Sequence, residues 1–215
     1  MNFADRLTSA VKRSGSVIAA GLDPRLEDLP LFVQEGLVAG TSLEDRLDSI
    51  LSSFYLKALE KLSASVAAIK PNIAFFEQYG IGGLRAYEQV IAAARAMGLL
   101  VITDAKRGDI GSTAQAYSSA FLGKTSIAQE SRSFFESDAL TVNPYLGFDT
   151  LEVFINDCIK YKKGIFVLVK TSNPGSASIQ DITDRKSGKS ISALVADWLG
   201  ENSGRLYLPC PGSGA

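Results

Sequence analysis

The sequence predicts an α/β protein with a parallel sheet, and it favours a (β/α)8 TIM-type barrel. Short apolar segments alternate with longer segments that carry apolar residues at helical spacing, which is the pattern of repeated βα units. The short segments lack polar alternation, so both faces of each strand should be buried. Each one ends in a polar or charged residue, and a barrel builds its active site from several strand ends. These residues are Asp23, Lys70, Asp104, Asn143 and Lys170.

The predicted elements follow one another as five βα units after an amphipathic helix in residues 1–15, a pattern unlike a secretory signal. Strands are expected at Val17–Gly21, Ser65–Ile69, Leu99–Thr103, Ala139–Val142 and Gly164–Val169. Helices are expected at Leu43–Leu62, Leu84–Met97, Thr113–Leu122, Leu151–Tyr161 and Ile191–Leu199, with loops at Gly36–Thr41 and Ser172–Gly188. A doubly wound sheet is the alternative, but it usually has a Gly-rich first turn, and residues 21–25 read GLDPR.

The composition argues against several classes of function. The 215 residues suit one domain, and a net charge of −1 gives no positive excess for nucleic acid or an acidic membrane surface. We expect no membrane span, because no apolar stretch is long enough. The absence of histidine removes the Ser-His-Asp triad and most zinc sites. Cys158 and Cys210 are interpreted as unpaired thiols in a reducing cytoplasm.

The most informative segment is the Asp-x-Lys-x-x-Asp sequence that follows a predicted buried strand. Alternate strand residues point the same way, so Asp104 and Lys106 should share one face, and Lys70 offers a second cation. A fixed ammonium can stabilise negative charge on a carbon and then protonate it, while a neighbouring carboxylate keeps the lysine charged. The same carboxylate would favour departure of an anionic group, so decarboxylation fits. A salt-bridge network without catalysis is the alternative.

The segment Val101–Thr113 fits the signature of the orotidine 5'-phosphate decarboxylase family at every constrained position, and the chain resembles that family from about Val17 to Gly200. Further matches lie in order along the chain: GLDPR at 21–25, IKPNIAFFE at 69–77, TVNPYLG at 141–147 and KTSNPGS at 170–176. Five ordered motifs make a coincidence improbable. The resemblance implies conversion of orotidine 5'-phosphate to uridine 5'-phosphate in pyrimidine biosynthesis.

The resemblance also implies roles for single residues. Lys106 would protonate C6 of the pyrimidine, Asp104 would lie beside the departing carboxylate, and Lys70 would complete the charge network. It implies no metal and no organic cofactor.

A second group of implied roles concerns the substrate and a partner subunit. Asp109 and Thr113 would reach the partner's active site in a homodimer, and Ile110 would line the apolar pocket there. Asp23 would bind ribose hydroxyls, and Ser172 would contact the pyrimidine edge.

The chain departs from the family at its C-terminal end. The family barrel has eight strands, whereas residues 201–215 hold one short apolar run at most, so we expect an incomplete barrel with the last strands missing or altered. The phosphate-binding loop and arginine are not visible, which predicts little turnover and poor solubility. The alternatives are an inactive barrel that only binds nucleotide and a related Asp-x-Lys phosphosugar barrel enzyme, which would use a metal ion.

Overall fold

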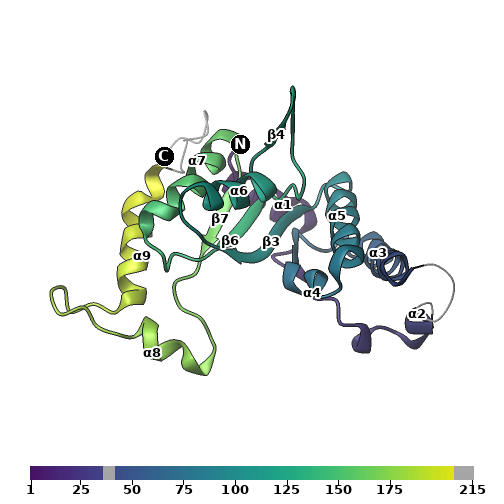
Figure 1. Ribbon diagram of the computed structural model, residues 1–215, viewed down its shortest axis with the longest axis horizontal. Coiled ribbons are helices and arrows are strands. Elements are labelled where there is room, and N and C mark those ends of the chain that lie inside the picture. The colour runs from purple at the N-terminus through teal and green to yellow at the C-terminus, as the bar shows by residue number, and fades with distance from the viewer. Residues whose placement is uncertain (36–41, 206–215) are drawn as a thin grey trace.

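Five parallel strands in chain order form the central sheet. The computed structural model describes residues 1–35 and 42–205. The strands are β1 (Ala19–Leu22), β2 (Ala68–Pro71), β3 (Leu100–Arg107), β6 (Ala139–Val142) and β7 (Gly164–Val167), paired in the order β1-β2-β3-β6-β7 (Figure 1). A doubly wound sheet reverses its strand order at a switch point, whereas a barrel does not. The described residues therefore form part of a (β/α)8 barrel, and their sheet is open at β1 and β7.

The helices surround this sheet, with α3 and α5 at one end of the molecule and α8 and α9 at the other (Figure 1). Their bounds are α1 (Phe3–Ser14), α2 (Leu31–Gln34), α3 (Leu43–Leu62), α4 (Ile73–Glu77), α5 (Gly80–Ala96), α6 (Gly111–Phe121), α7 (Glu152–Tyr161), α8 (Ala177–Gln180) and α9 (Ile191–Asn202). The predicted strands and helices are confirmed, with ends that differ by a few residues. Residues 36–41 and 206–215, which include the first predicted loop and Cys210, lie outside the described residues.

Side-chain caps explain where the main helices begin. Asn2 caps α1, with its side chain accepting the backbone N–H of Asp5, and Ser42 and Ser190 cap α3 and α9 in the same way. Such caps satisfy N–H groups that have no partner inside the helix. Gly15 ends α1 in the left-handed conformation, which glycine adopts without steric cost.

Short elements escaped the sequence prediction. Helices α2, α4 and α8 have four or five residues each, and α8 lies inside the segment predicted to be a loop at Ser172–Gly188. Strands β4 (Thr125–Ile127) and β5 (Glu130–Arg132) form a mostly exposed antiparallel hairpin that projects from the molecule (Figure 1). Three to five residues are too few to show a period, so the pattern carried no signal for them.

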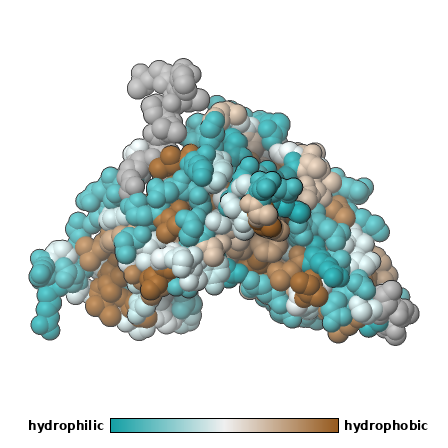
Figure 2. All heavy atoms as spheres, turned by 45° about the horizontal axis from the view of Figure 1, so that its top comes forward, coloured by the Kyte–Doolittle hydropathy of each residue, from teal (hydrophilic) through white to brown (hydrophobic). Residues whose placement is uncertain are grey.

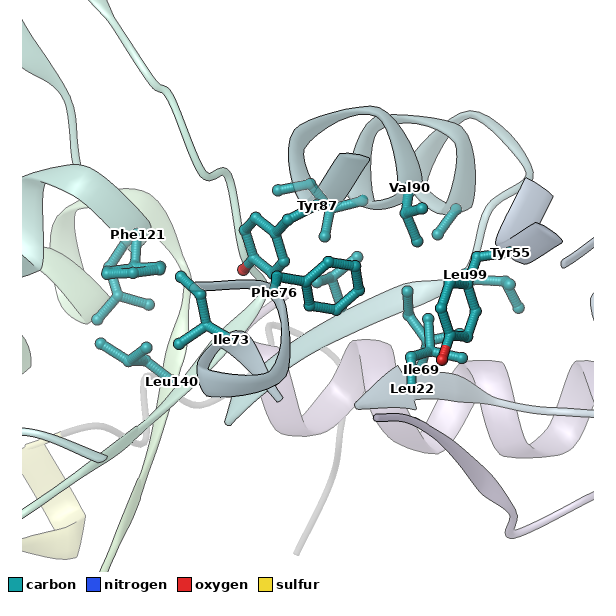
Figure 3. Close-up of a cluster of buried hydrophobic side chains, with 14 of the residues drawn as sticks. Leu22, Tyr55, Ile69, Ile73, Phe76, Tyr87, Val90, Leu99, Phe121 and Leu140 are labelled. Carbon is teal, nitrogen blue, oxygen red and sulfur yellow. The ribbon is translucent and has the colours of Figure 1, made fainter. Parts of the chain in front are cut away.

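The two faces of the sheet pack against different partners. Ile69, Val101 and Leu140 belong to the main core together with side chains from the helices, such as Phe76 and Tyr87 (Figure 3). The alternate strand residues Ala68, Leu100, Ile102 and Ala139 pack against Ala10 of α1. Helix α1 therefore covers the N-terminal ends of the strands, and the C-terminal ends on that same face remain accessible.

The prediction that every strand is buried on both faces is wrong for the two edge strands. It holds for β2, for the first half of β3 and largely for β6, whereas β1 and β7 are mostly half-buried or exposed. Val17 and Ile18 before β1 and Phe166 in β7 are exposed. Each edge strand has only one neighbour in the open sheet, so fewer side chains cover it. The molecule has an arched outline, and hydrophobic groups are visible toward the lower end of both limbs of the arch (Figure 2).

Candidate active site

Two lysines and one aspartate meet where β2 and β3 end. Lys106 Nζ lies 2.5 Å from Asp104 Oδ1, and Lys70 Nζ lies 3.2 Å from Asp104 Oδ2, so each carboxylate oxygen binds one ammonium group. The Asp104 side chain is 12% exposed, whereas those of Lys70 and Lys106 are 40% and 50% exposed. The carboxylate is therefore shielded from water while both cations face the open end of the strands.

A β-bulge in β3 lies between Thr103 and Arg107, in the segment that carries Asp104 and Lys106. β3 takes four steps from Thr103 to Arg107 while β6 takes two steps from Leu140 to Val142. Lys106 has φ +50°, which is the left-handed region that side-chain-bearing residues seldom adopt. The prediction that Asp104 and Lys106 share one face is confirmed: Ala105 between them packs against the main core, and the Asp104 and Lys106 side chains meet at 2.5 Å. Such bulges and strained residues cluster at functional sites.

Thr141 of β6 is a member of this cluster that the sequence analysis did not single out. Its hydroxyl oxygen accepts the backbone N–H groups of Ala105 and Lys106, each at 2.9 Å. The same hydroxyl donates to Asp104 Oδ1 at 3.0 Å. The one sequence signal for Thr141 was its place as the first residue of the TVNPYLG segment. Its contacts with β3 could not be predicted, because the pairing of strands that are distant in the sequence cannot be read from composition.

The lysines lower the pKa of Asp104. Burial by itself would raise the pKa of this carboxyl group, but the hydrogen bonds and charges of Lys106 and Lys70 outweigh it and leave the pKa below its ordinary value. Asp104 is therefore ionised at neutral pH, and it holds two positive charges beside an accessible surface.

The segment after the bulge is fixed by contacts around Arg107. Arg107 Nη2 lies 2.5 Å from Glu77 Oε1, and its guanidinium group lies 5.7 Å from the centre of the Phe121 ring. A Cβ atom on Gly108 would lie 2.8 Å from the carbonyl oxygen of Asn143, so only glycine fits between β3 and the end of β6. These contacts hold the junction between β3 and α6 close to the cluster.

The other five predicted site residues do not join the cluster. Asp23 follows β1 and is exposed, and Ser172 is exposed in the segment after β7. Asp109, Ile110 and Thr113 lie at the start of α6, where Ile110 is 62% exposed and Asp109 Oδ1 accepts the backbone N–H of Ile110. Within residues 1–35 and 42–205, no ion pair involves Asp109.

A cavity of about 500 Å³ lies beyond the C-terminal ends of β6 and β7. Its lining includes Asn143, Thr171, Asn173 and Gln180, so Ser172 lies between two lining residues. Gln180 accepts the backbone N–H of Thr171 at 2.9 Å and donates to the Thr171 hydroxyl at 2.8 Å, which ties α8 to the segment after β7. The cavity lies at the same edge of the sheet as the cluster, and its lining combines these polar groups with apolar side chains such as Phe148, Leu168 and Ile179.

Three further observations concern the described residues alone. They contain no group of three or more His, Cys, Asp or Glu side chains that could hold a metal ion. None of their helices is both long enough and apolar enough to cross a bilayer. Cys158 is a buried free thiol, and burial raises its pKa to about 12.

The family model, the sequence relatives and the solved structures that match this chain all point to one family. Residues 46–200 match the model of the "Orotidine 5'-phosphate decarboxylase / HUMPS family". The chain is 46% identical over 210 residues to the orotidine 5'-phosphate decarboxylase of Rhodopirellula baltica, covering 96% of this chain, and 40% identical to that of Caldicellulosiruptor saccharolyticus, covering 92%. The structure of Leishmania donovani OMP decarboxylase superposes with a TM-score of 0.62 at 32% identity, over 92% of this chain and 64% of that one.

The chain spans 66% of the length of each of the two bacterial relatives. The matched region nevertheless includes β2, β3, β6, β7 and the charged cluster. The family model matches most of the chain, and the relatives share the fold at more than 30% identity. Membership of the family therefore does not rest on a single motif. The chain belongs to the orotidine 5'-phosphate decarboxylase / HUMPS family.

Proposed function

We propose that this protein decarboxylates orotidine 5'-phosphate to uridine 5'-phosphate, with Lys106 as the proton donor. The observation that carries the proposal is the shared contact of Lys70 and Lys106 with the shielded carboxylate of Asp104 at the ends of two adjacent parallel strands. The names of the relatives support the reaction.

The proposed step needs no electron acceptor. The bond between C6 and the substrate carboxylate breaks, carbon dioxide leaves, and the electron pair stays on C6. The ammonium group of Lys106 stabilises this charge and transfers a proton to C6, and solvent then restores the proton to the lysine. Asp104 disfavours the bound substrate carboxylate by like-charge repulsion, and Lys70 holds the second oxygen of Asp104.

Two further residues would bind the substrate. Asp23 follows β1 at the same edge of the sheet, and its carboxylate would accept hydrogen bonds from ribose hydroxyls. Ser172, between two residues that line the 500 Å³ cavity, would contact the pyrimidine edge. No metal or organic cofactor enters the proposed chemistry.

The proposal includes a cytoplasmic homodimer. Asp109, Ile110 and Thr113 lie at the start of α6, and Ile110 presents an apolar side chain to the surface. In a dimer, Asp109 and Thr113 would enter the partner's site and Ile110 would line its apolar pocket. Burial of Ile110 there would remove apolar area from water.

The test is the loss of ultraviolet absorbance of orotidine 5'-phosphate, followed with and without a chelator. Turnover by this chain should be insensitive to chelation and should fall by about 10² to 10⁴-fold in Lys106→Ala, which is the usual contribution of a positioned proton donor. Lys189→Ala is the matched control, because Lys189 also pairs with an aspartate, but its partner is Asp197 of α9 and not Asp104. Its rate should equal that of the wild type.

Two other outcomes would replace the proposal. Turnover that a chelator abolishes would indicate a metal-dependent phosphosugar enzyme. Binding of uridine 5'-phosphate by calorimetry without any turnover would indicate a barrel that only binds nucleotide. A Lys106→Ala protein that keeps its fold by circular dichroism and most of its rate would show that another group donates the proton.

A further inference from the structure

The hydroxyl group of Thr141 uses all of its hydrogen-bonding capacity inside the charged cluster. A hydroxyl has one hydrogen to donate and two lone pairs to accept. Thr141 Oγ1 accepts from Ala105 N and Lys106 N at 2.9 Å each and donates to Asp104 Oδ1 at 3.0 Å. One atom of β6 therefore contacts three consecutive residues of β3.

These contacts replace the backbone pairing that the bulge removes. Between Thr103 and Arg107, β3 has more residues than β6 can pair, so the N–H groups in the bulge have no regular partner in the ladder. Thr141 satisfies two of them. The N–H group of Ala105 is the part-buried one of the two, and an unpaired backbone N–H shielded from water costs free energy comparable to a lost hydrogen bond. The side chain of Thr141 thus stabilises a conformation in which Lys106 has φ +50°.

The same hydroxyl reaches both members of the shortest ion pair in the cluster. It contacts Lys106 through the backbone and Asp104 through Oδ1, and Oδ1 is the atom that lies 2.5 Å from Lys106 Nζ. Moving this hydroxyl would therefore change the direction of the ammonium group and the rotation of the carboxylate together. Misplacement of a catalytic group by about 1 Å can cost about 10²-fold in rate.

We propose that Thr141 is a positioning residue: it fixes the bulge in β3 and thereby the placement of the Lys106 ammonium group against Asp104. The inference rests on the proposed decarboxylation for its kinetic consequence, but its structural content is independent of any activity. Thr141 touches neither substrate nor reacting atoms in this account and acts only through Lys106 and Asp104.

Two substitutions separate positioning from packing. Thr141→Val keeps the β-branched shape and loses the hydroxyl, whereas Thr141→Ser keeps the hydroxyl and loses a methyl group. A packing role predicts that the serine variant is the more damaged, and a positioning role predicts the opposite. Both variants are compared with the wild-type chain for kcat and KM with orotidine 5'-phosphate, and for amide hydrogen exchange of Ala105 and Lys106.

In Thr141→Val we expect kcat to fall by about 10 to 100-fold with KM changed by less than about threefold, because placement and not binding is lost. Exchange of the two amides should accelerate by about tenfold, the loss of one hydrogen bond, while Asn143 N–H, bonded to the Arg107 carbonyl, is unchanged. Thr141→Ser should stay within about threefold of the wild type in both measurements.

The two readouts keep this inference distinct from the decarboxylase proposal. If the wild-type chain has no turnover, the proposed function fails, and amide exchange alone decides whether Thr141 holds the bulge. Unchanged exchange at Ala105 and Lys106 in Thr141→Val overturns the inference. It is also overturned if exchange accelerates but kcat is retained, or if the serine and valine variants lose kcat equally.

Discussion

At the scale of single residues, Asp104 shows how a local motif and a distant contact combine. The Asp-x-Lys spacing indicated that Asp104 and Lys106 would meet, and the sequence placed Lys70 at the end of the preceding strand. The spacing of residues in the sequence could not reveal the bulge or the role of Thr141, because both depend on how β6 lies beside β3. The roles of the individual residues stay predictions, whereas the contact among the three charges is a feature of the structure.

Acid should remove the contribution of Asp104 to stability. Its pKa is lower in the folded chain than its ordinary value of about 3.9, so the unfolded chain binds the proton more readily. The stabilisation is therefore complete above about pH 5 and is lost as the pH falls through the folded pKa. We expect the difference in free energy of unfolding between the wild type and Asp104→Asn to shrink between about pH 5 and pH 2, measured by urea denaturation.

The two lysines supply the control for this measurement. In a background with Lys70→Ala and Lys106→Ala, burial is the main remaining influence on Asp104, and burial raises the pKa of this group. The pH dependence of the same difference should then reverse its direction. A difference that stays constant with pH in the original background would show that the lysines do not hold the carboxylate in its charged form.

At the scale of elements, close packing of α5 against its neighbours depends on two glycines. A Cβ atom on Gly82 would lie 2.3 Å from the carbonyl oxygen of Glu44 in α3, and one on Gly83 would lie 2.0 Å from the carbonyl oxygen of Phe76 in α4. Both obstacles are backbone atoms, which cannot rotate away. The helical pattern predicted that α5 begins at Leu84, whereas the helix begins at Gly80, because glycine has a low helix propensity.

Adding one methyl group at this contact should therefore destabilise the fold. We expect Gly82→Ala to lower the free energy of unfolding by about 1 to 3 kcal/mol, since the helices must separate to admit the Cβ atom. The matched control is Gly200→Ala in α9, where nothing lies within 4 Å of the added atom. It should raise stability by up to about 1 kcal/mol through helix propensity. Urea denaturation measures both, and equal effects would contradict the packing argument.

At the scale of the whole molecule, residues far apart in the sequence meet at both ends of the sheet. Lys70, Asp104 and Thr141 converge at the C-terminal ends of the strands, whereas Arg6 and Arg95 converge on the buried Asp138 at the other end. Asp138 is 2% exposed and also accepts the backbone N–H of Val101. The sequence analysis missed this second cluster, because none of its members lies near another in the chain.

The proposed dimer predicts that two inactive variants recover activity when their subunits are mixed. If Asp109 acts in the partner's site, a heterodimer of Lys106→Ala and Asp109→Ala chains contains one site with both residues intact. Mixing the two inactive proteins under conditions that exchange subunits should therefore restore about a quarter of the wild-type rate. Half of the dimers are then mixed, and one of the two sites in each mixed dimer is intact. If Asp109 acts within its own chain, mixing restores nothing. Sedimentation of the mixture reports whether dimers are present.

The sequence by itself determined the α/β class, the positions of the five main strands along the chain and the family, because apolar periodicity and ordered motifs are local properties of the chain. Only the tertiary structure decided that β1 and β7 lie at open edges, that β3 bulges before Arg107, and that Thr141 holds Asp104 and Lys106. The physical reason is that burial, register and side-chain hydrogen bonds depend on neighbours that the chain brings together only after it folds.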